Sequence, residues 1–168
     1  MAAPATQYSI RLFLPGDASL YRAMRLEALK NEPGVYGANY AEEAALPESA
    51  WTEKINDPRR ACFGLYADDE LIGITGVIID KDDTGKGHMI QSYIRKAYRE
   101  LGLSAILYKA RIAWAQGRKL TGLAVGHKES NLASKAANQH FAFMYSHSEA
   151  RTWPDGSTEE ILYYELVL

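Results

Sequence analysis

The chain has 168 residues, of which 47% are apolar and 24% charged, and its 19 basic and 21 acidic side chains give a net charge of −2. This length is typical of one domain, and the near-neutral charge argues against a protein held on nucleic acid or on an anionic membrane by a basic field. A single cysteine, Cys62, excludes a disulfide framework and an all-cysteine metal site. We therefore expect one domain over residues 1–168.

No stretch predicts a transmembrane helix, because the most apolar one, residues 71–79, is far shorter than the roughly 20 residues that a bilayer requires. The first eight residues carry neither a basic leader nor an apolar core. We therefore expect no secretory signal, no membrane partner and a cytoplasmic protein.

Apolar periodicity and turn residues divide the chain into alternating strands and helices. In chain order we expect a strand over residues 8–14, a helix over 18–30, a helical region over 40–55, strands over 61–67, 71–80 and 88–95, a helix over 103–116, a strand over 120–125, a helix over 131–141, and strands over 143–153 and 160–168. Asp17 is placed to cap the first helix, and Pro47 interrupts the second helical region.

The long helix over residues 103–116 lies between two strands, which predicts a β-α-β crossover with those two strands parallel. The remaining strands follow one another through short turns, as in an antiparallel sheet. The expected class is therefore mixed α/β, with a central and mostly antiparallel sheet of about seven strands.

The most informative junction lies where the fourth strand passes into this long helix. Gly102 stands at the helix start, where the side chain that it lacks would otherwise block a ligand. A helix start offers free N–H groups and a partial positive charge, which suits a phosphate, and Arg95, Lys96 and Arg99 add formal charge. A phosphate site and an ordinary loop in which glycine eases the turn both fit these residues.

These residues carry a resemblance to a known family. The run Arg99-Glu-Leu-Gly102-Leu-Ser104 resembles the R/Q-x-x-G-x-G/A motif of the GNAT superfamily of N-acetyltransferases, which cradles the pyrophosphate of acetyl coenzyme A. Residues 131–143 resemble the second block of that family, N-x-x-A/S-x-x-A. The order of elements agrees from residue 8 to residue 168.

The resemblance implies a GNAT-like fold with a β-α-β cofactor-binding core and a splayed strand pair. Backbone groups of the strand before the motif are expected to meet the thioester and the pantetheine arm, and the motif itself is expected to hold the pyrophosphate. The cofactor-binding residues that it implies are Tyr93, Ile94, Arg99, Glu100, Leu101, Gly102, Leu103, Ser104, Asn131 and Asn138.

Several positions depart from the family pattern, and two of them bear on the chemistry. Glu100 replaces a frequent glycine and brings an anion close to a phosphate. Asn138 stands where many members carry the tyrosine that protonates the departing thiolate. Tyr145, just after the second block, is our candidate for the missing proton donor, although nothing in the spacing selects it over Tyr93 or Tyr108.

His88 is the candidate base, because it lies eleven residues before Arg99, where several GNAT subfamilies carry a catalytic Glu or His. Its ordinary pKa of about 6.5 suits proton removal. A solvent-exposed histidine just after the turn over residues 85–87 is the alternative. Glu42 and Glu43 fall in the region that typically forms one wall of the acceptor site, where they could attract a cationic amine. A solvated helix face is the alternative for these two.

The implied reaction is transfer of the acetyl group from acetyl coenzyme A to a primary amine, directly and within a ternary complex. A small-molecule acceptor is favoured, and no metal is expected, because the histidines lack zinc-binding spacing. The aromatic pair Tyr163 and Tyr164 in the final hairpin suggests a homodimer. Two alternatives remain open: an acyl coenzyme A-binding module without turnover, and acetylation of a protein N-terminus or lysine.

Overall fold

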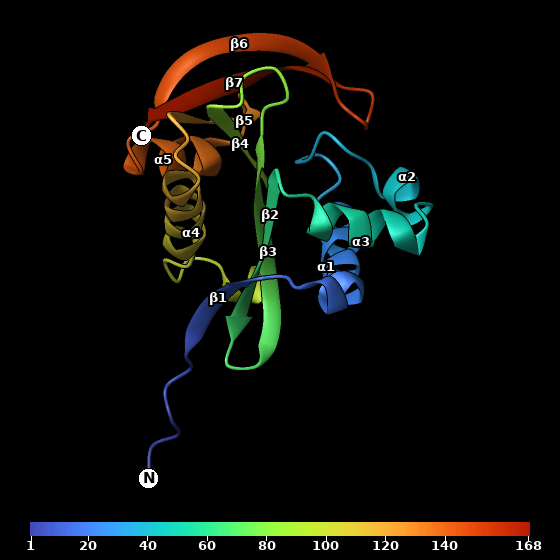
Figure 1. Ribbon diagram of the computed structural model, residues 1–168, viewed down its shortest axis with the longest axis vertical. Helices are drawn as coiled ribbons and strands as arrows, with labels where there is room; N and C mark the ends of the chain where they lie inside the picture. Colours follow the sequence, from blue (N-terminus) through green and yellow to red (C-terminus); the bar gives the residue numbers. More distant parts are fainter.

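A seven-stranded sheet crosses the molecule, and helices cover both of its faces (Figure 1). The structure is a computed structural model that describes all of residues 1–168. The strands are β1 (Tyr8–Leu12), β2 (Arg60–Ala67), β3 (Glu70–Ile79), β4 (Lys86–Ile94), β5 (Gly122–Lys128), β6 (Met144–Thr152) and β7 (Thr158–Val167). The helices are α1 (Ala18–Asn31), α2 (Tyr40–Ala44), α3 (Glu48–Asn56), α4 (Ser104–Gly117) and α5 (Leu132–His140), with short 3-10 turns at η1 (Pro15–Asp17) and η2 (Lys96–Tyr98).

The strand order in the sheet is β1-β2-β3-β4-β5-β7-β6. Every neighbouring pair is antiparallel except β4 and β5, which are parallel and joined through α4. This arrangement confirms the mixed α/β class, the seven strands and the crossover expected from the sequence. It also places α4 against one face of the sheet, where it contacts β1 to β5.

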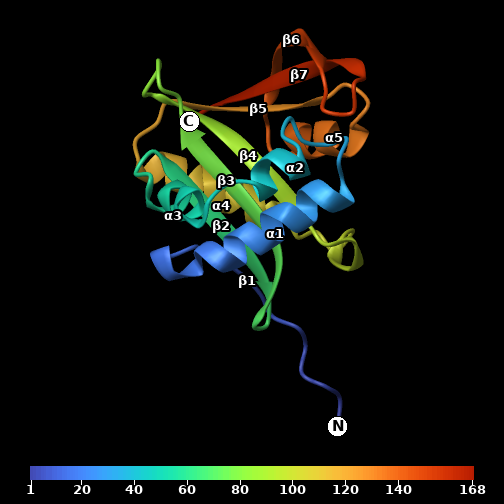
Figure 2. The same ribbon diagram turned by 90° about the vertical axis from the view of Figure 1, so that its right-hand side faces the viewer.

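The helices divide between the two faces of the sheet. Helices α1, α2 and α3 lie across one face, and α4 lies on the other (Figures 1 and 2). Tyr21 and Leu29 of α1 and Trp51 of α3 are buried on the first face, and Val77 of β3 and Leu123 of β5 are buried in the core cluster that α4 joins. Each such apolar side chain contributes about 1.5 to 3 kcal/mol when fully buried. The sheet is therefore anchored from both sides around its central strands.

Two local signals act somewhat differently from the expectation. The helical region expected over residues 40–55 is two helices, and Pro47, which has no N–H to donate, stands at the N-cap of α3. Asp17 precedes α1, but its carboxylate accepts a 2.8 Å bond from the Leu14 N–H. It therefore closes the η1 turn instead of capping α1.

The final hairpin does not present its two tyrosines together. Tyr164 is only 3% exposed and packs into the core, whereas Tyr163 stacks on the His147 ring with centroids 4.6 Å apart. None of the helices combines the length and the hydrophobicity needed to cross a membrane.

Candidate active site

The parallel pair β4 and β5 separates partway along its length. Its ladder ends at the pair His88–Ala124. On the other edge of β4, Gln91 and Ser92 together oppose the single β3 residue Thr75, which makes a β-bulge in which Gln91 has a φ of 60°. A bulge bends and twists the strand that carries it. From residue 89 onward the two parallel strands therefore leave a gap.

A cavity of ≈ 710 Å³ occupies this gap. Residues 89–94 of β4 and 125–128 of β5 form its edges, α4 and α5 line it on one face of the sheet, and residues 34–36 line it on the α1 face. Its volume falls within the usual range of small-molecule sites, roughly 300 to 1,000 Å³. Because walls from both faces contribute, two reactants could meet in it from opposite sides of the sheet.

The loop before α4 presents free backbone N–H groups beside this cavity. Gly102 adopts a φ of 75°, and a Cβ at this position would meet no heavy atom within 4 Å. The N–H groups of Gly102, Leu103 and Ser104 have no acceptor in the structure, as is usual at a helix start. Glu100 is also left-handed, with a φ of 62°. The backbone therefore offers several donors to an anion.

Arg99 lies between this loop and α1. Its Nε donates to the Ile94 carbonyl over 2.7 Å, and its guanidinium forms an ion pair with Glu32. The guanidinium also lies 5.7 Å from the centre of the Tyr93 ring. Arg99 thus stands beside the free N–H groups with its position fixed by three neighbours.

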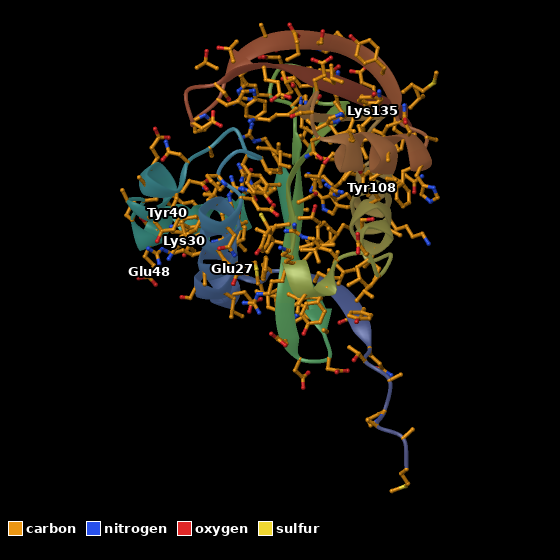
Figure 3. The ribbon with its side chains drawn as sticks, turned by 180° about the vertical axis from the view of Figure 1, so that it is seen from behind. Glu27, Lys30, Tyr40, Glu48, Tyr108 and Lys135 are labelled. Carbon is orange, nitrogen blue, oxygen red and sulfur yellow. The ribbon has the colours of Figure 1, made fainter.

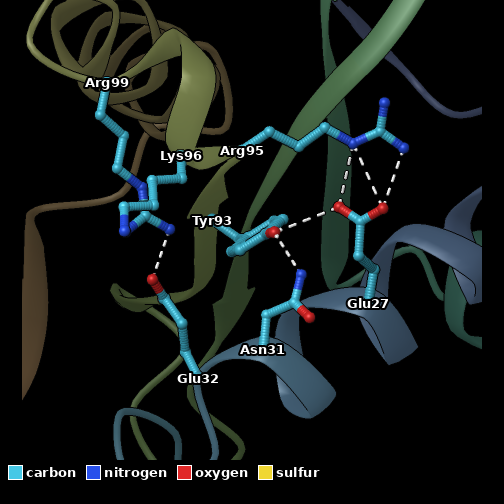
Figure 4. A pocket seen from close by; sticks show the side chains of 7 residues that line it. All are labelled: Glu27, Asn31, Glu32, Tyr93, Arg95, Lys96 and Arg99. Carbon is cyan, nitrogen blue, oxygen red and sulfur yellow. Dashed lines mark hydrogen bonds and ion pairs between the residues drawn. The ribbon is translucent and has the colours of Figure 1, made fainter.

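A second, charged hollow of ≈ 440 Å³ adjoins the cavity on the α1 face (Figure 4). Its walls are Glu27, Asn31, Glu32, Tyr93, Arg95, Lys96 and Arg99. The Tyr93 hydroxyl donates to Glu27 over 3.1 Å and accepts from Asn31 over 3.2 Å. Arg95 binds the Glu27 carboxylate through two nitrogens, which holds the pKa of Glu27 below its usual range. Lys96 is the one cation here without a carboxylate partner.

A buried polar network connects α4, α5 and β5 at the cavity wall. Tyr108 lies on the side of α4 that is turned toward the sheet (Figure 3), and its hydroxyl donates to Asn138 Oδ1. Asn138 Nδ2 lies 3.0 Å from His127 Nδ1, so His127 accepts there and carries its proton on Nε2, which is buried without a partner. Burial raises the pKa of Tyr108 and lowers that of His127. At neutral pH the phenol therefore keeps its proton and the imidazole is uncharged.

Arg111, on α4, is a buried cation in the same wall, with 2% of its surface exposed. Its Nε donates to the Leu107 carbonyl over 3.1 Å and its Nη1 to Ser92 Oγ over 2.8 Å. Ser92 Oγ in turn lies 2.9 Å from Thr75 Oγ1, and the guanidinium lies 4.8 Å from the centre of the Tyr108 ring. No carboxylate pairs with it, and burial lowers its pKa to about 10.

The structure brings most of the expected cofactor residues to the cavity. Residues 100–103 form the loop that leads into α4, and the Asn131 side chain also caps α5 by accepting from the Ser134 N–H over 3.1 Å. The six that line the cavity are Tyr93, Ile94, Arg99, Ser104, Asn131 and Asn138.

The two expected catalytic side chains lie outside the cavity wall. His88 belongs to the last rung of the β4–β5 ladder, and its Nε2 is 2.7 Å from Asp80 Oδ2. This contact, with two backbone N–H bonds, lowers the pKa of Asp80 to about 2. Tyr145 is 56% exposed on β6, where its ring meets the edge of Tyr164. Neither side chain lines the space between the parallel strands.

The two acidic residues expected at the acceptor site have different surroundings. Glu43 accepts from Arg25 Nε over 2.8 Å and from Lys54 Nζ over 3.4 Å, so its charge is already balanced within the helical face. Glu42 is exposed on α2. Neither lines the cavity or the charged hollow.

Two residues that the sequence did not single out belong to the site. Arg111 follows Leu107 by four residues on the inward stripe of α4, so a charged residue in an apolar stripe was the available signal. The Tyr36 hydroxyl donates to the Ser92 carbonyl over 2.8 Å. Tyr36 lies in an irregular segment, and no pattern there could have predicted its contact with β4.

Similar folds occur among solved acetyltransferases. A GNAT-family acetyltransferase from Streptococcus pneumoniae aligns with 96% of this chain and 100% of its own, at 18% identity and a TM-score of 0.83. YncA from Salmonella typhimurium, solved with its cofactor acetyl-CoA, aligns over 96% and 94% at 14% identity, with a TM-score of 0.80. A ribosomal-protein-alanine N-acetyltransferase from Brucella melitensis aligns over 95% and 99% at 18% identity, with a TM-score of 0.79. At these identities the likeness shows the fold.

A sheet of this order, opened between its parallel strands above a free helix start, is similar in fold to these solved acetyltransferases. The sequence matches the acetyltransferase (GNAT) family over residues 23–143, and the chain belongs to that family. It is an enzyme of acetyl-CoA-dependent acyl transfer. A search among curated proteins finds no match to this chain.

Proposed function

We propose that this enzyme transfers the acetyl group of acetyl coenzyme A to the primary amine of a small molecule, by direct attack within a ternary complex. The observation that carries the proposal is the cavity between β4 and β5, which ends beside the free N–H groups of the loop before α4. Its walls come from both faces of the sheet, so the donor and the acceptor need not compete for one entrance. Its volume suits a small acceptor better than a folded protein surface.

The residues present fit the diphosphate of coenzyme A. The N–H groups of Gly102, Leu103 and Ser104 are free, no Cβ at Gly102 obstructs an approach, and Arg99 lies beside them. Bonds between backbone N–H groups and phosphate oxygens are charge-assisted and therefore strong. The Asn131 side chain, already fixed as a helix cap, lies where the cofactor arm would pass.

The reaction forms a C–N bond and breaks the C–S bond of the thioester. A primary ammonium ion with a pKa of about 10.4 first gives one proton to a base, and the free amine attacks the carbonyl carbon. The nitrogen then gives up a second proton, and the departing sulfur takes up one, so that the products are an amide and a free thiol. Proximity within one cavity supplies much of the acceleration.

Tyr108 is the proton donor that the surroundings favour. Its hydroxyl reaches Asn138, the residue at the position where many family members carry a tyrosine, and both side chains line the cavity. Because burial raises its pKa, Tyr108 holds its proton at neutral pH. The same shift makes it a weaker acid, so its proton would pass to the sulfur only as the C–S bond breaks and negative charge develops there. His88 remains the candidate base, and since it lies outside the cavity wall it would act through water.

Glu100 offers a test of the phosphate loop. Glutamate at this position adopts a left-handed conformation, which destabilises the fold by about 1 kcal/mol, and glycine adopts it without this strain. Glu100→Gly should therefore raise the melting temperature by about 2 to 4 °C. It should also tighten coenzyme A binding, measured by calorimetry, because a carboxylate no longer repels the phosphates. Glu100→Gln is the matched control: it removes the charge but keeps the strained backbone, so affinity should rise without the thermal gain. A lower melting temperature for Glu100→Gly would contradict this account.

Turnover is tested by a thiol-release assay with acetyl coenzyme A and a panel of primary amines. Thiol release that depends on the amine, with the acetylated amine identified by mass spectrometry, is the expected result. The alternative is a binding module without turnover, which Asn138 in place of a tyrosine favours. Calorimetry separates the two, because a pure binder would hold coenzyme A tightly and release no thiol with any amine.

A further inference from the structure

Arg111 carries more binding capacity than the protein itself uses. A guanidinium has five N–H donors, and two of those of Arg111 are engaged, by the Leu107 carbonyl and by Ser92 Oγ. The other three have no partner in the structure, although 98% of the residue's surface is buried and it lines the cavity. A buried charge without a counter-ion is costly, and evolution normally pairs or removes it.

The charges of the cavity wall favour an anion. Its cations are Arg99, Arg111 and Lys128, and its one carboxylate is Glu32. Glu32 is paired with Arg99, and Lys128 lies 4.0 Å from Glu159 and over the ring of Trp153. Arg111 is therefore the one cation of the wall that has neither a carboxylate within 4 Å nor contact with bulk water.

The phosphates of the cofactor cannot supply this anion if they bind at the loop before α4. Arg111 lies seven residues beyond Ser104, or about 10 Å along the helix at 1.5 Å per residue. Its Nε is held by the Leu107 carbonyl, and its Nη1 is directed to Ser92 of β4. Between the diphosphate and the thioester, the cofactor arm contains only uncharged groups, among them two amides and a hydroxyl.

We propose that Arg111 is a carboxylate receptor, and that one of the two reactants carries a carboxylate into the cavity. This inference rests on the proposed function and names its substrate class. With acetyl as the acyl group, the carboxylate belongs to the acceptor, which is then an amino acid or a similar amine. A dicarboxylic acyl chain, such as succinyl, is the other source of the same group. In either case the carboxylate is bound and unchanged while the amide bond forms and the C–S bond breaks.

The guanidinium is built for this ligand. Ser92 and Thr75 are linked through their hydroxyls and hold one edge of it, while the Tyr108 ring supports its face. A planar fork with free N–H groups can bind a carboxylate through two parallel bonds, which Lys cannot do. The geometry also keeps the charge beside Tyr108, at the place where the thioester and the amine would meet.

The first test uses the unchanged protein and matched reactants. One arm compares succinyl with butyryl coenzyme A, which differ in a terminal carboxylate, by calorimetry and by kcat/KM. The other compares a set of α-amino acids with their carboxamides as acceptors of acetyl from acetyl coenzyme A. At least a roughly tenfold preference for the carboxylate in one arm is expected, equivalent to one charge-assisted bond. The arm that shows it identifies the source.

The second test uses Arg111→Met, with Arg118→Met as the matched control. Arg118 also lies at α4, as its C-cap beside Trp114, but it is exposed and does not line the cavity. Arg111→Met should lose the carboxylate preference and keep or raise the melting temperature, since an apolar side chain replaces a buried charge. Arg118→Met should keep the preference. Arg111→Lys should recover only part of it.

Three results would overturn the inference. If neither arm shows a carboxylate preference in the unchanged protein, Arg111 is not a receptor, whatever the variants do. If Arg111→Met lowers the rates with all reactants by the same factor, the guanidinium acts on the common leaving thiolate. If it lowers the melting temperature and affects all reactants alike, its role is structural. Failure to bind any coenzyme A ester would refute the proposed function itself, and this inference with it.

Discussion

Gly102→Val is expected to weaken coenzyme A binding by about 100-fold. A valine at this position would project into the space that is open around Gly102 and would keep phosphate oxygens away from the N–H groups of Leu103 and Ser104. Bonds from N–H groups to charged groups contribute about 1.5 to 3 kcal/mol each, and 1.4 kcal/mol is a factor of ten in affinity. The loss of one or two such bonds therefore gives the expected size, measured by isothermal calorimetry.

The chain contains a matched control for the backbone. Gly156, in the turn between β6 and β7, also has a positive φ, 85°, and also has open space around its missing Cβ. Valine at Gly102 or at Gly156 should cost about 1 to 2 kcal/mol of stability, because both positions are left-handed. Only Gly102→Val should lose affinity. Equal losses at both positions, or unchanged binding in Gly102→Val, would show that this loop is not the phosphate site.

Tyr108→Phe is expected to lower kcat by about 100-fold while leaving the Kd for coenzyme A within about twofold. Phenylalanine keeps the ring, which stacks on Phe141 at 4.4 Å and meets Phe143 edge-on, so the packing is preserved. What is lost is the proton donor and its bond to Asn138. Steady-state thiol release and calorimetry on the same preparation measure the two quantities.

The same change at Tyr145 decides between the two candidate hydroxyls. Tyr145 is exposed on β6 and its hydroxyl has no hydrogen-bond partner, whereas Tyr108 belongs to the cavity wall. If Tyr145→Phe carries the loss in kcat and Tyr108→Phe does not, the assignment to Tyr108 is wrong. Melting temperatures of both variants guard against a fall in kcat caused by unfolding, since a buried acceptor left without its donor costs about 1 kcal/mol or more.

The fold was largely predictable because its signals are local. The helix expected over residues 103–116 is α4, displaced by one residue, and the crossover rule then gave the parallel orientation of β4 and β5. Pro47 marked the boundary of α3, because proline has no N–H to donate and this is evident from the sequence alone. The loop that we propose for the phosphates was likewise visible, because Gly102 marks the positive φ at the helix start.

The interior of the site was not predictable, because it depends on contacts between distant segments. Tyr108, Asn138 and His127 come from three elements, and nothing in their spacing indicates that their polar atoms meet. The sequence does not reveal that His88 contacts Asp80, because this contact depends on the register between β3 and β4. The bulge at Gln91 is equally hidden, since a left-handed glutamine leaves no mark in the sequence.

Residues 32–39, which join α1 to α2, belong to no helix or strand, and yet residues 34–36 close one side of the cavity. The other walls come from the regular elements β4, β5, α4 and α5. We therefore expect the shape of this irregular connector to contribute to acceptor selectivity, together with Arg111 of α4. Exchange of residues 34–36 alone, with Glu32 and its ion pair to Arg99 kept, should redirect the enzyme to new amines while its use of acetyl coenzyme A is retained.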